Sequence, residues 1–429
     1  MPVDYRGGAT GDWAIVTRGA AGQEGGGAGG TLHRLAVLWL VGLNLRITVL
    51  ALPPVLPAVR DAFALSQAAL AALTTLPVLL LAAGAPVGSA IIARIGPYRA
   101  LFLGLLVIAS ASALRGPLTH GSPGAVMLFT LTFLMGLAIA TIQPTLPALV
   151  HRWLERSAAL GTATYMNGLL VGEMLAASLT LPLVLPLVGV WRGVLVAWSL
   201  PAVFAALALL TLRGAAVRSG PVRRGVGPNG RGTGKTGIWP NWRSGSTWRL
   251  GLLQGGASVV YFTGNTFLPT YLHATDMPGL VGPSLTALNT AQVPASLLLA
   301  VLPTAWVTSP LLAAALGVVT ILGLALLLIA APIPVLAGAA VIGFTSAVLL
   351  IIAFTLPVIV AAEDAHRASA GMFTIGYGLA FLLPLLGGSL WDATGQPALA
   401  FAPAFLSALW VLVLAPSLRQ RARPADASS

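Results

Sequence analysis

A stretch of 86 residues, from Met277 to Ala362, contains no Asp, Glu, Lys, Arg or His. A helix of roughly 20 apolar residues crosses the ~30 Å hydrocarbon core of a bilayer. The stretch therefore has room for three membrane-spanning helices, and turn signals at 304–310 and 332–334 separate them. The whole chain of 429 residues is 57% hydrophobic and 8% charged, whereas a soluble domain is about 25% charged. The sequence thus predicts a polytopic membrane protein.

Read in the same way, the chain predicts an all-α membrane protein with twelve transmembrane helices in two six-helix bundles. The spans lie near 34–59, 68–93, 98–115, 123–150, 157–187, 191–212, 248–272, 283–306, 309–331, 333–361, 368–391 and 396–417. The predicted domains are an N-terminal tail over 1–31, bundles over 32–212 and 248–418, a linker over 213–247 and a C-terminal tail over 419–429. The first 31 residues carry too few apolar side chains to form a core and are expected to be disordered, and no cleavable signal peptide is expected.

The distribution of basic residues predicts the orientation. The tails and the connections on their side of the membrane carry 19 of the 23 Lys and Arg residues, and the other side carries Arg60, Arg115 and Arg192. By the positive-inside rule, both termini are expected in the cytoplasm, in a multi-pass protein of the cytoplasmic (inner) membrane. The net charge of +12 does not indicate a nucleic-acid partner, because a mean hydropathy of +0.90 leaves too little polar surface for a soluble binder.

The two halves of the chain repeat weakly, at an offset of about 211 residues. The matching pairs are Leu56–Pro57 with Leu268–Pro269, Thr145–Pro147 with Thr355–Pro357, and Arg156 with Arg367. A parallel repeat with six spans in each half is typical of transporters in which two bundles rock about a central site.

Several motifs between 34 and 417 resemble the major facilitator superfamily, and within it the cyanate/nitroimidazole (CynX/NimT) transporter branch. They are Asn44–Arg46 with Leu52–Pro57, Leu73–Pro77, Pro147–Val150, Trp191–Arg192, Phe267–Pro269, and Ser369–Gly371 with Gly376–Gly378. The superfamily's gating signature between spans two and three is present in part, as Arg94, Gly96 and Arg99. Ala93 stands where the resemblance implies an aspartate and Ser89 where it implies a glycine.

Two ionisable residues lie well inside the predicted spans, Arg46 and Glu173. A charge at the bilayer centre costs about 2.5–3.5 kcal/mol on insertion scales, so such a residue faces a partner or a cavity. At 1.5 Å per residue, Arg46 lies about 18 Å and Glu173 about 24 Å into their spans. Two interpretations follow. The residues form a structural salt bridge, or Arg46 binds a planar anion in the central cavity while Glu173 acts as a counter-charge and proton-coupling group.

Uncharged polar residues within the spans give a wider set of candidates for the cavity wall. They are Asn44, Gln143, Tyr165, Asn167, Gln254, Tyr261, Asn265, Asn289, Gln292 and Tyr377. Because spans 1, 4, 7 and 10 line the cavity in the superfamily, the resemblance favours Asn44, Gln143, Tyr261 and Asn265 as substrate-binding residues. Each also has a structural interpretation as an interhelical hydrogen bond, which is favoured for Asn289 and Tyr377.

No catalytic or metal site is predicted. The five histidines lie far apart without metal-ligand spacing, and no Ser/His/Asp arrangement can be assembled. The absence of cysteine also excludes disulfides and thiolate sites. The chain is therefore not expected to be an enzyme or to bind a cofactor.

The sequence and the resemblance together predict a secondary active transporter, expected to work as a monomer by rocker-switch alternating access with proton coupling. Its substrate is expected to be a small anion such as cyanate, or a compact planar heterocycle. Two alternatives remain: a multidrug or nitroimidazole-type efflux transporter of the same fold, and a membrane sensor that does not transport.

Overall fold

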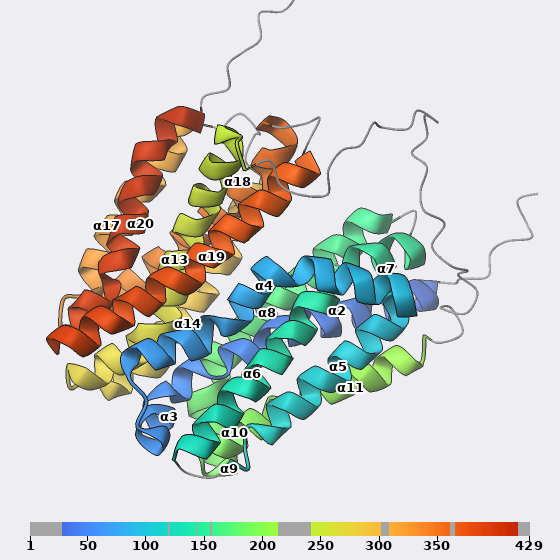
Figure 1. Ribbon diagram of the computed structural model, residues 1–429, viewed down its shortest axis with the longest axis horizontal. Coiled ribbons are helices and arrows are strands. Elements are labelled where there is room, and N and C mark those ends of the chain that lie inside the picture. The colour runs from blue at the N-terminus through green and yellow to red at the C-terminus, as the bar shows by residue number, and fades with distance from the viewer. Residues whose placement is uncertain are drawn as a thin grey trace, which may run out of the picture.

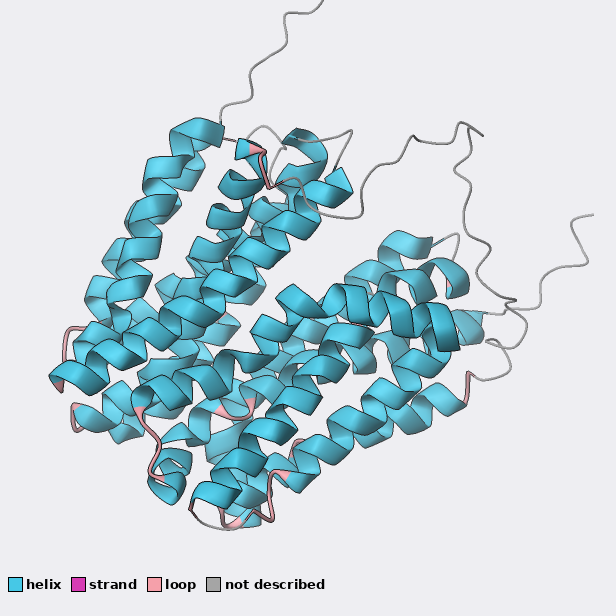
Figure 2. Cartoon of the chain, viewed as in Figure 1, coloured by secondary structure: helices cyan, strands magenta, loops and turns pink. Residues whose placement is uncertain are grey.

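The computed structural model describes residues 28–118, 121–143, 145–154, 157–212, 242–301, 309–360 and 365–418. Within these ranges every regular element is a helix (Figure 2), which confirms the predicted all-α fold. The C-terminal tail, Arg156, most of the N-terminal tail and linker, and most of the turn expected at 304–310 lie outside the described residues. The first described helix, α2, begins at Ala28, about two turns before the first apolar run.

Six predicted spans account for the first half. Its elements are α2 (Ala28–Leu50), η1 (Pro53–Val55), α3 (Leu56–Phe63), α4 (Gln67–Ile95), α5 (Pro97–Leu114), α6 (Ser122–Ile142), α7 (Thr145–Trp153), α8 (Ala158–Leu179), η3 (Thr180–Val184), α9 (Leu185–Val188), α10 (Trp191–Ala197) and α11 (Leu200–Leu210). The first span is divided into α2, η1 and α3 because Pro53 and Pro54 have no amide hydrogen for the helical ladder.

The second half repeats this arrangement. Its elements are α13 (Gly245–Ala274), η4 (Pro278–Leu280), α14 (Val281–Thr290), α15 (Gln292–Val301), α17 (Pro310–Leu327), α18 (Pro332–Val360), α19 (Ala365–Thr394), η6 (Pro397–Phe401), α20 (Ala402–Leu414) and η7 (Ala415–Leu418). Among the described residues, ten helices are long and apolar enough to cross a membrane. The other two predicted spans are α13, which is 30 residues long but carries many polar side chains, and the pair α14–α15, whose helices are 10 residues each.

The two halves form two bundles whose helices lie closest at one end (Figure 1). We call this end the distal face; there α3 ends at Phe63, α4 begins at Gln67 and α19 ends at Thr394. The opposite end, where α2 begins and α20 ends, is the terminal face. A shared apolar cluster joins the bundles, and it includes Ala71 and Val78 of α4 packed with residues of α13, α14 and α19. Within this cluster α4 contributes its distal half, and Ala177 of α8 also takes part.

Close packing of α2 against α8 fixes the centre of the N-terminal bundle. Gly42 lies against the Tyr165 carbonyl, Gly168 against the Trp39 carbonyl and Gly172 against the backbone of Leu43, and a Cβ on any of these glycines would overlap that backbone. Small residues let helix backbones approach in a membrane. This crossing brings the middle of α2 beside the middle of α8.

Arg115, which the sequence places at the end of the third span on the side opposite the termini, is buried, with 1% of its surface exposed. It ends α5, and its Nη2 donates to the Thr48 carbonyl in the last turn of α2 at 3.0 Å. The last carbonyls of a helix lack intrahelical donors and favour a cation. Arg115 therefore caps the C-terminal end of α2, which Pro53 and Pro54 terminate. The position of Arg115 at the end of a predicted span did not reveal this role.

Replacing Gly168 with Ala should force α2 and α8 apart, because the new Cβ would meet the Trp39 carbonyl. Overpacking of this kind costs about 1–3 kcal/mol, so thermal unfolding of the detergent-purified protein should shift to lower temperature. Gly378→Ala in α19 is the matched control, because nothing lies within 4 Å of its Cβ position. Equal unfolding temperatures for the two variants would contradict the close-packing account.

Candidate functional site

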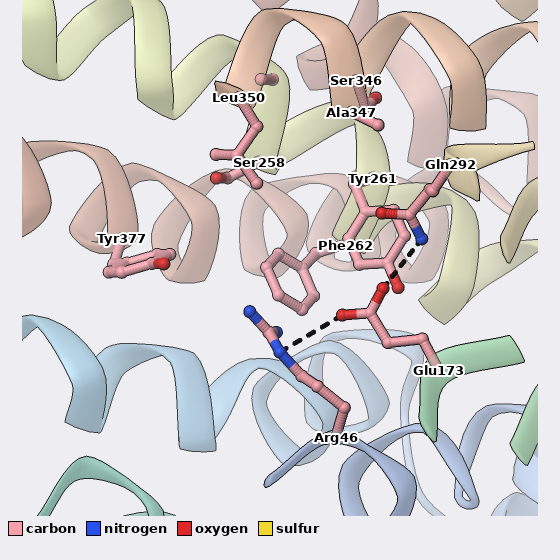
Figure 3. A pocket seen from close by; sticks show the side chains of 11 residues that line it. Arg46, Glu173, Ser258, Tyr261, Phe262, Gln292, Ser346, Ala347, Leu350 and Tyr377 are labelled. Atoms are coloured by element: carbon pink, nitrogen blue, oxygen red, sulfur yellow. Dashed lines mark hydrogen bonds and ion pairs between the residues drawn. The ribbon is translucent and has the colours of Figure 1, made fainter. Parts of the chain in front are cut away.

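A pocket lies between the two bundles, at mid-depth of α2 and α8. Its wall consists of Arg46, Glu173, Ala257, Ser258, Tyr261, Phe262, Gln292, Ser346, Ala347, Leu350 and Tyr377. The N-terminal bundle supplies the two charged residues, and α13, α15, α18 and α19 supply the other nine (Figure 3). The volume open to the centres of water-sized molecules is about 30 Å³, which is room for about two or three waters. In this conformation the pocket fits a solute of a few heavy atoms.

Arg46 and Glu173 form an ion pair on one side of this pocket. The Nε atom of Arg46 lies 3.2 Å from Oε1 of Glu173, and the two side chains are 17% and 6% exposed. Two buried charges are costly unless they are paired and hydrogen-bonded. The contact through Nε leaves the terminal nitrogens of the guanidinium directed into the pocket (Figure 3), where Tyr377 also interacts with Arg46.

Glu173 is also bound from the C-terminal bundle. The amide nitrogen Nε2 of Gln292 donates to its Oε2 at 2.8 Å. One carboxylate thus accepts from α2 through one oxygen and from α15 through the other. Because the two donors belong to different bundles, loss of the charge on Glu173 would weaken both the ion pair and a contact between the bundles.

Tyr261 is held in place by a chain of amides behind the pocket wall. Its hydroxyl donates to Oδ1 of Asn289 at 2.7 Å, and Nδ2 of Asn289 donates to Oδ1 of Asn265 at 3.0 Å. All three residues are at most 7% exposed. The network fixes the phenol ring next to Glu173 and Gln292 (Figure 3).

Ser346 gives the pocket an unpaired polar group. It lies on α18 and is 3% exposed, and its Oγ has no hydrogen-bond partner among the described residues. A buried polar atom without a partner is unfavourable by about 1–3 kcal/mol. Its place in the wall makes it a candidate donor to a bound solute.

The structure separates the predicted site residues into two groups. Arg46, Glu173 and Tyr261 line the pocket. Asn44 does not, because its Nδ2 donates to the Leu40 and Pro201 carbonyls and ties α2 to α11. Asn265 supports Tyr261 from behind, and Gln143 is the half-buried residue that ends α6, away from the lining residues.

The predicted gating residues lie at the turn between α4 and α5, on the terminal face. Arg94 and Arg99 are exposed. Gly96 has φ of +82°, a conformation that favours glycine. The backbone conformation of the turn is therefore a sufficient reason for a glycine at this position.

Sequence reasoning ranked Tyr377 as structural and did not single out Ser346 or Phe262, yet all three line the pocket. Tyr377 stacks on Phe373 with ring centroids 5.7 Å apart, so it packs and lines the pocket at once. A serine among apolar residues of the tenth span was the available signal for Ser346, because a polar side chain in a span needs a partner or a cavity. Among the described residues no three His, Asp or Glu side chains gather as metal ligands.

Comparison with known proteins agrees with this architecture. The family model of the Major Facilitator Superfamily matches residues 37–383, so the chain belongs to this superfamily. It is 30% identical over 241 residues to the "2-nitroimidazole transporter" of Escherichia coli (strain K12), and 31% identical over 174 residues to the "Cyanate transport protein CynX" of that organism. These alignments cover 56% and 41% of this chain, and 57% and 44% of the relatives.

A longer alignment, to the "Uncharacterized transporter YycB" of Bacillus subtilis (strain 168), has 28% identity and covers 82% of this chain and 85% of that protein. Among solved structures, the peptide transporter POT in complex with sulfate matches with a TM-score of 0.67 and 15% identity, covering 90% of this chain and 93% of that chain. The nucleoside transporter NupG matches with a TM-score of 0.66 and 13% identity, covering 90% and 98%. These similarities show the shared fold.

Substitution of one member of the ion pair should destabilise the protein more than substitution of both. Glu173→Leu leaves Arg46 buried without its counter-charge, a loss of about 3–5 kcal/mol, whereas the double variant Arg46→Met/Glu173→Leu should recover part of it. Thermal unfolding of the two single variants and the double variant measures the coupling.

The exposed pair Arg60–Asp61, at 3.1 Å, provides the matched control. Its Arg60→Met/Asp61→Leu cycle should show a coupling of about 0–1 kcal/mol. A coupling for Arg46 and Glu173 as small as that of the exposed pair would contradict the buried-pair account.

Proposed function

We propose that the protein is a secondary active transporter of a small anion, which binds Arg46 in the pocket between the bundles. The observation that carries this proposal is the guanidinium whose terminal nitrogens face a small cavity while Nε holds Glu173. A guanidinium offers parallel donors to a planar anion. The relatives named for cyanate and 2-nitroimidazole transport are consistent with a compact solute.

The substrate and Glu173 compete for the same guanidinium. A bound anion next to Glu173 experiences like-charge repulsion, which protonation of the carboxyl relieves. Protonated Glu173 keeps a hydrogen-bond acceptor for Gln292 and releases the positive charge of Arg46 to the substrate. This exchange couples anion binding to proton binding, with Glu173 as the coupling residue.

The rest of the wall supplies recognition. Ser346 offers a hydroxyl donor, and Phe262, Tyr261 and Tyr377 offer ring surfaces. Because both bundles line the pocket, rocking of the bundles would open it to one side of the membrane at a time. From the distribution of charge, the terminal face lies in the cytoplasm and the distal face outside the cytoplasmic membrane, and we propose that the transporter works as a monomer.

A second candidate is a transporter of neutral planar heterocycles, of the nitroimidazole efflux type. The aromatic rings in the wall favour it, since Phe262 and Tyr377 could stack on a flat ring. It differs from the anion proposal in what it requires of Arg46, because a neutral ring needs no positive charge. A sensor that does not transport is a third possibility, and a flux measurement distinguishes it.

Thermal unfolding in the presence of candidate solutes tests the choice. Cyanate or nitrate at about 100 times its dissociation constant should stabilise the purified protein by about 2.7 kcal/mol. Neutral 2-nitroimidazole and a lipophilic cation should stabilise it less. Arg46→Ala should abolish the effect of the anions.

Arg46→Lys separates geometry from charge. A lysine keeps the positive charge but loses the paired donors, so anion affinity should fall about tenfold. Arg60→Lys, on an exposed arginine outside the pocket, should bind as the wild type does. Unchanged anion binding and flux in Arg46→Lys, or stabilisation by neutral or cationic solutes alone, would overturn the anion proposal and favour the second candidate.

A further inference from the structure

At the distal face, the bundles are joined by hydrogen bonds between the N-terminal end of a helix in one bundle and a side chain of the other bundle. The first four N–H groups of a helix have no acceptor within the helix. At the start of α4, the Leu70 N–H makes the first bond of the helical ladder, to the Ser66 carbonyl at 3.0 Å, and the Ala69 N–H donates to the Ser66 hydroxyl at 3.1 Å. The N–H groups of Gln67 and Ala68, in the first turn, donate to an acceptor in the other bundle.

That acceptor is the carboxylate of Asp392, near the end of α19. Its Oδ1 accepts from the Gln67 N–H at 2.8 Å and its Oδ2 from the Ala68 N–H at 2.9 Å. A negative charge is favourable at a helix N-terminus. Asp392 also lies in an exposed position, so water can take its place when the bundles separate.

Neighbouring residues bring the two helices close enough for this contact. Gly388, one turn before Asp392, lies against the backbone of Gln67 and Ala68, where a Cβ would come within 2.6 Å of it. Two turns deeper, Thr74 of α4 and Thr266 of α13 share a hydrogen bond of 2.8 Å. The contact of Asp392 is thus the outermost of a series that closes the distal face.

We propose that Asp392 is a positioning residue of the transport cycle, a latch that holds the distal gate closed by capping α4 across the two bundles. In the state described here the gate is closed and the latch is made. Opening the distal face breaks both hydrogen bonds, and water then becomes the acceptor for the Gln67 and Ala68 N–H groups. The latch therefore favours the distal-closed state. It slows opening of the distal face and lowers the population of the distal-open state.

The chain has no cysteine, so a single introduced thiol reports on the gate without other changes. Ala71 is fully buried in the cluster shared by the bundles, and Ala71→Cys should react slowly with a maleimide in lipid nanodiscs. Adding Asp392→Ala should raise the labelling rate about fivefold or more, because the open state becomes more populated. Asp392→Asn keeps one acceptor oxygen and should give an intermediate rate.

Asp61→Ala is the matched control, because Asp61 is an exposed carboxylate near the distal face whose ion pair is with Arg60 of the same helix. It should leave the Ala71→Cys labelling rate unchanged. An unchanged rate in Asp392→Ala, or an equal rise in Asp61→Ala, would overturn the latch. If Asp392→Ala fails to fold, the graded rate of Asp392→Asn against Asp61→Ala decides in the same way. The experiment uses no solute, so its outcome is independent of the anion proposal.

Discussion

A positive charge in the interior of the membrane-spanning region, which must keep a partner, is the constraint on which the rest of this structure depends. Arg46 lies near the middle of a membrane-spanning helix, and Glu173 pairs with it at 3.2 Å. The pairing requires α2 and α8 to approach closely, and Gly168 and Gly172 allow this. It also leaves the second oxygen of Glu173 to the C-terminal bundle, through Gln292. The carboxylate of Glu173 thus takes part in helix packing, in the contact between the bundles and in the chemistry of the pocket.

The sequence was enough to predict the helices and the two charges. An uncharged stretch of 86 residues has few alternatives to membrane spans, and an ionisable residue inside a span is conspicuous for the same reason. The uncharged wall of the pocket was harder to predict, because it depends on the rotation of each helix about its axis. Asn44 and Tyr377 show the difficulty: the first turns toward α11, whereas the second faces the pocket.

Arg115 and Asp392 show a second limit of sequence reasoning. Both lie at the ends of helices, where a charged residue is expected in water and attracts no attention. Each instead completes the hydrogen bonding of another helix, Arg115 at the end of α2 and Asp392 at the start of α4. Such caps join residues that are 67 and 325 positions apart in the sequence, and they can be recognised once the helices have been placed side by side.

The central claim is that a substrate anion competes with Glu173 for Arg46, and the anion affinity of Glu173→Gln tests it most directly. Glutamine keeps an oxygen for hydrogen bonding but removes the competing charge. The account predicts that the variant binds cyanate or nitrate about tenfold more tightly than the wild type at neutral pH, and that the wild type approaches the variant as the pH falls. Weaker binding in Glu173→Gln, with the fold intact, would mean that Glu173 supports the site rather than competes for it, and would contradict the account.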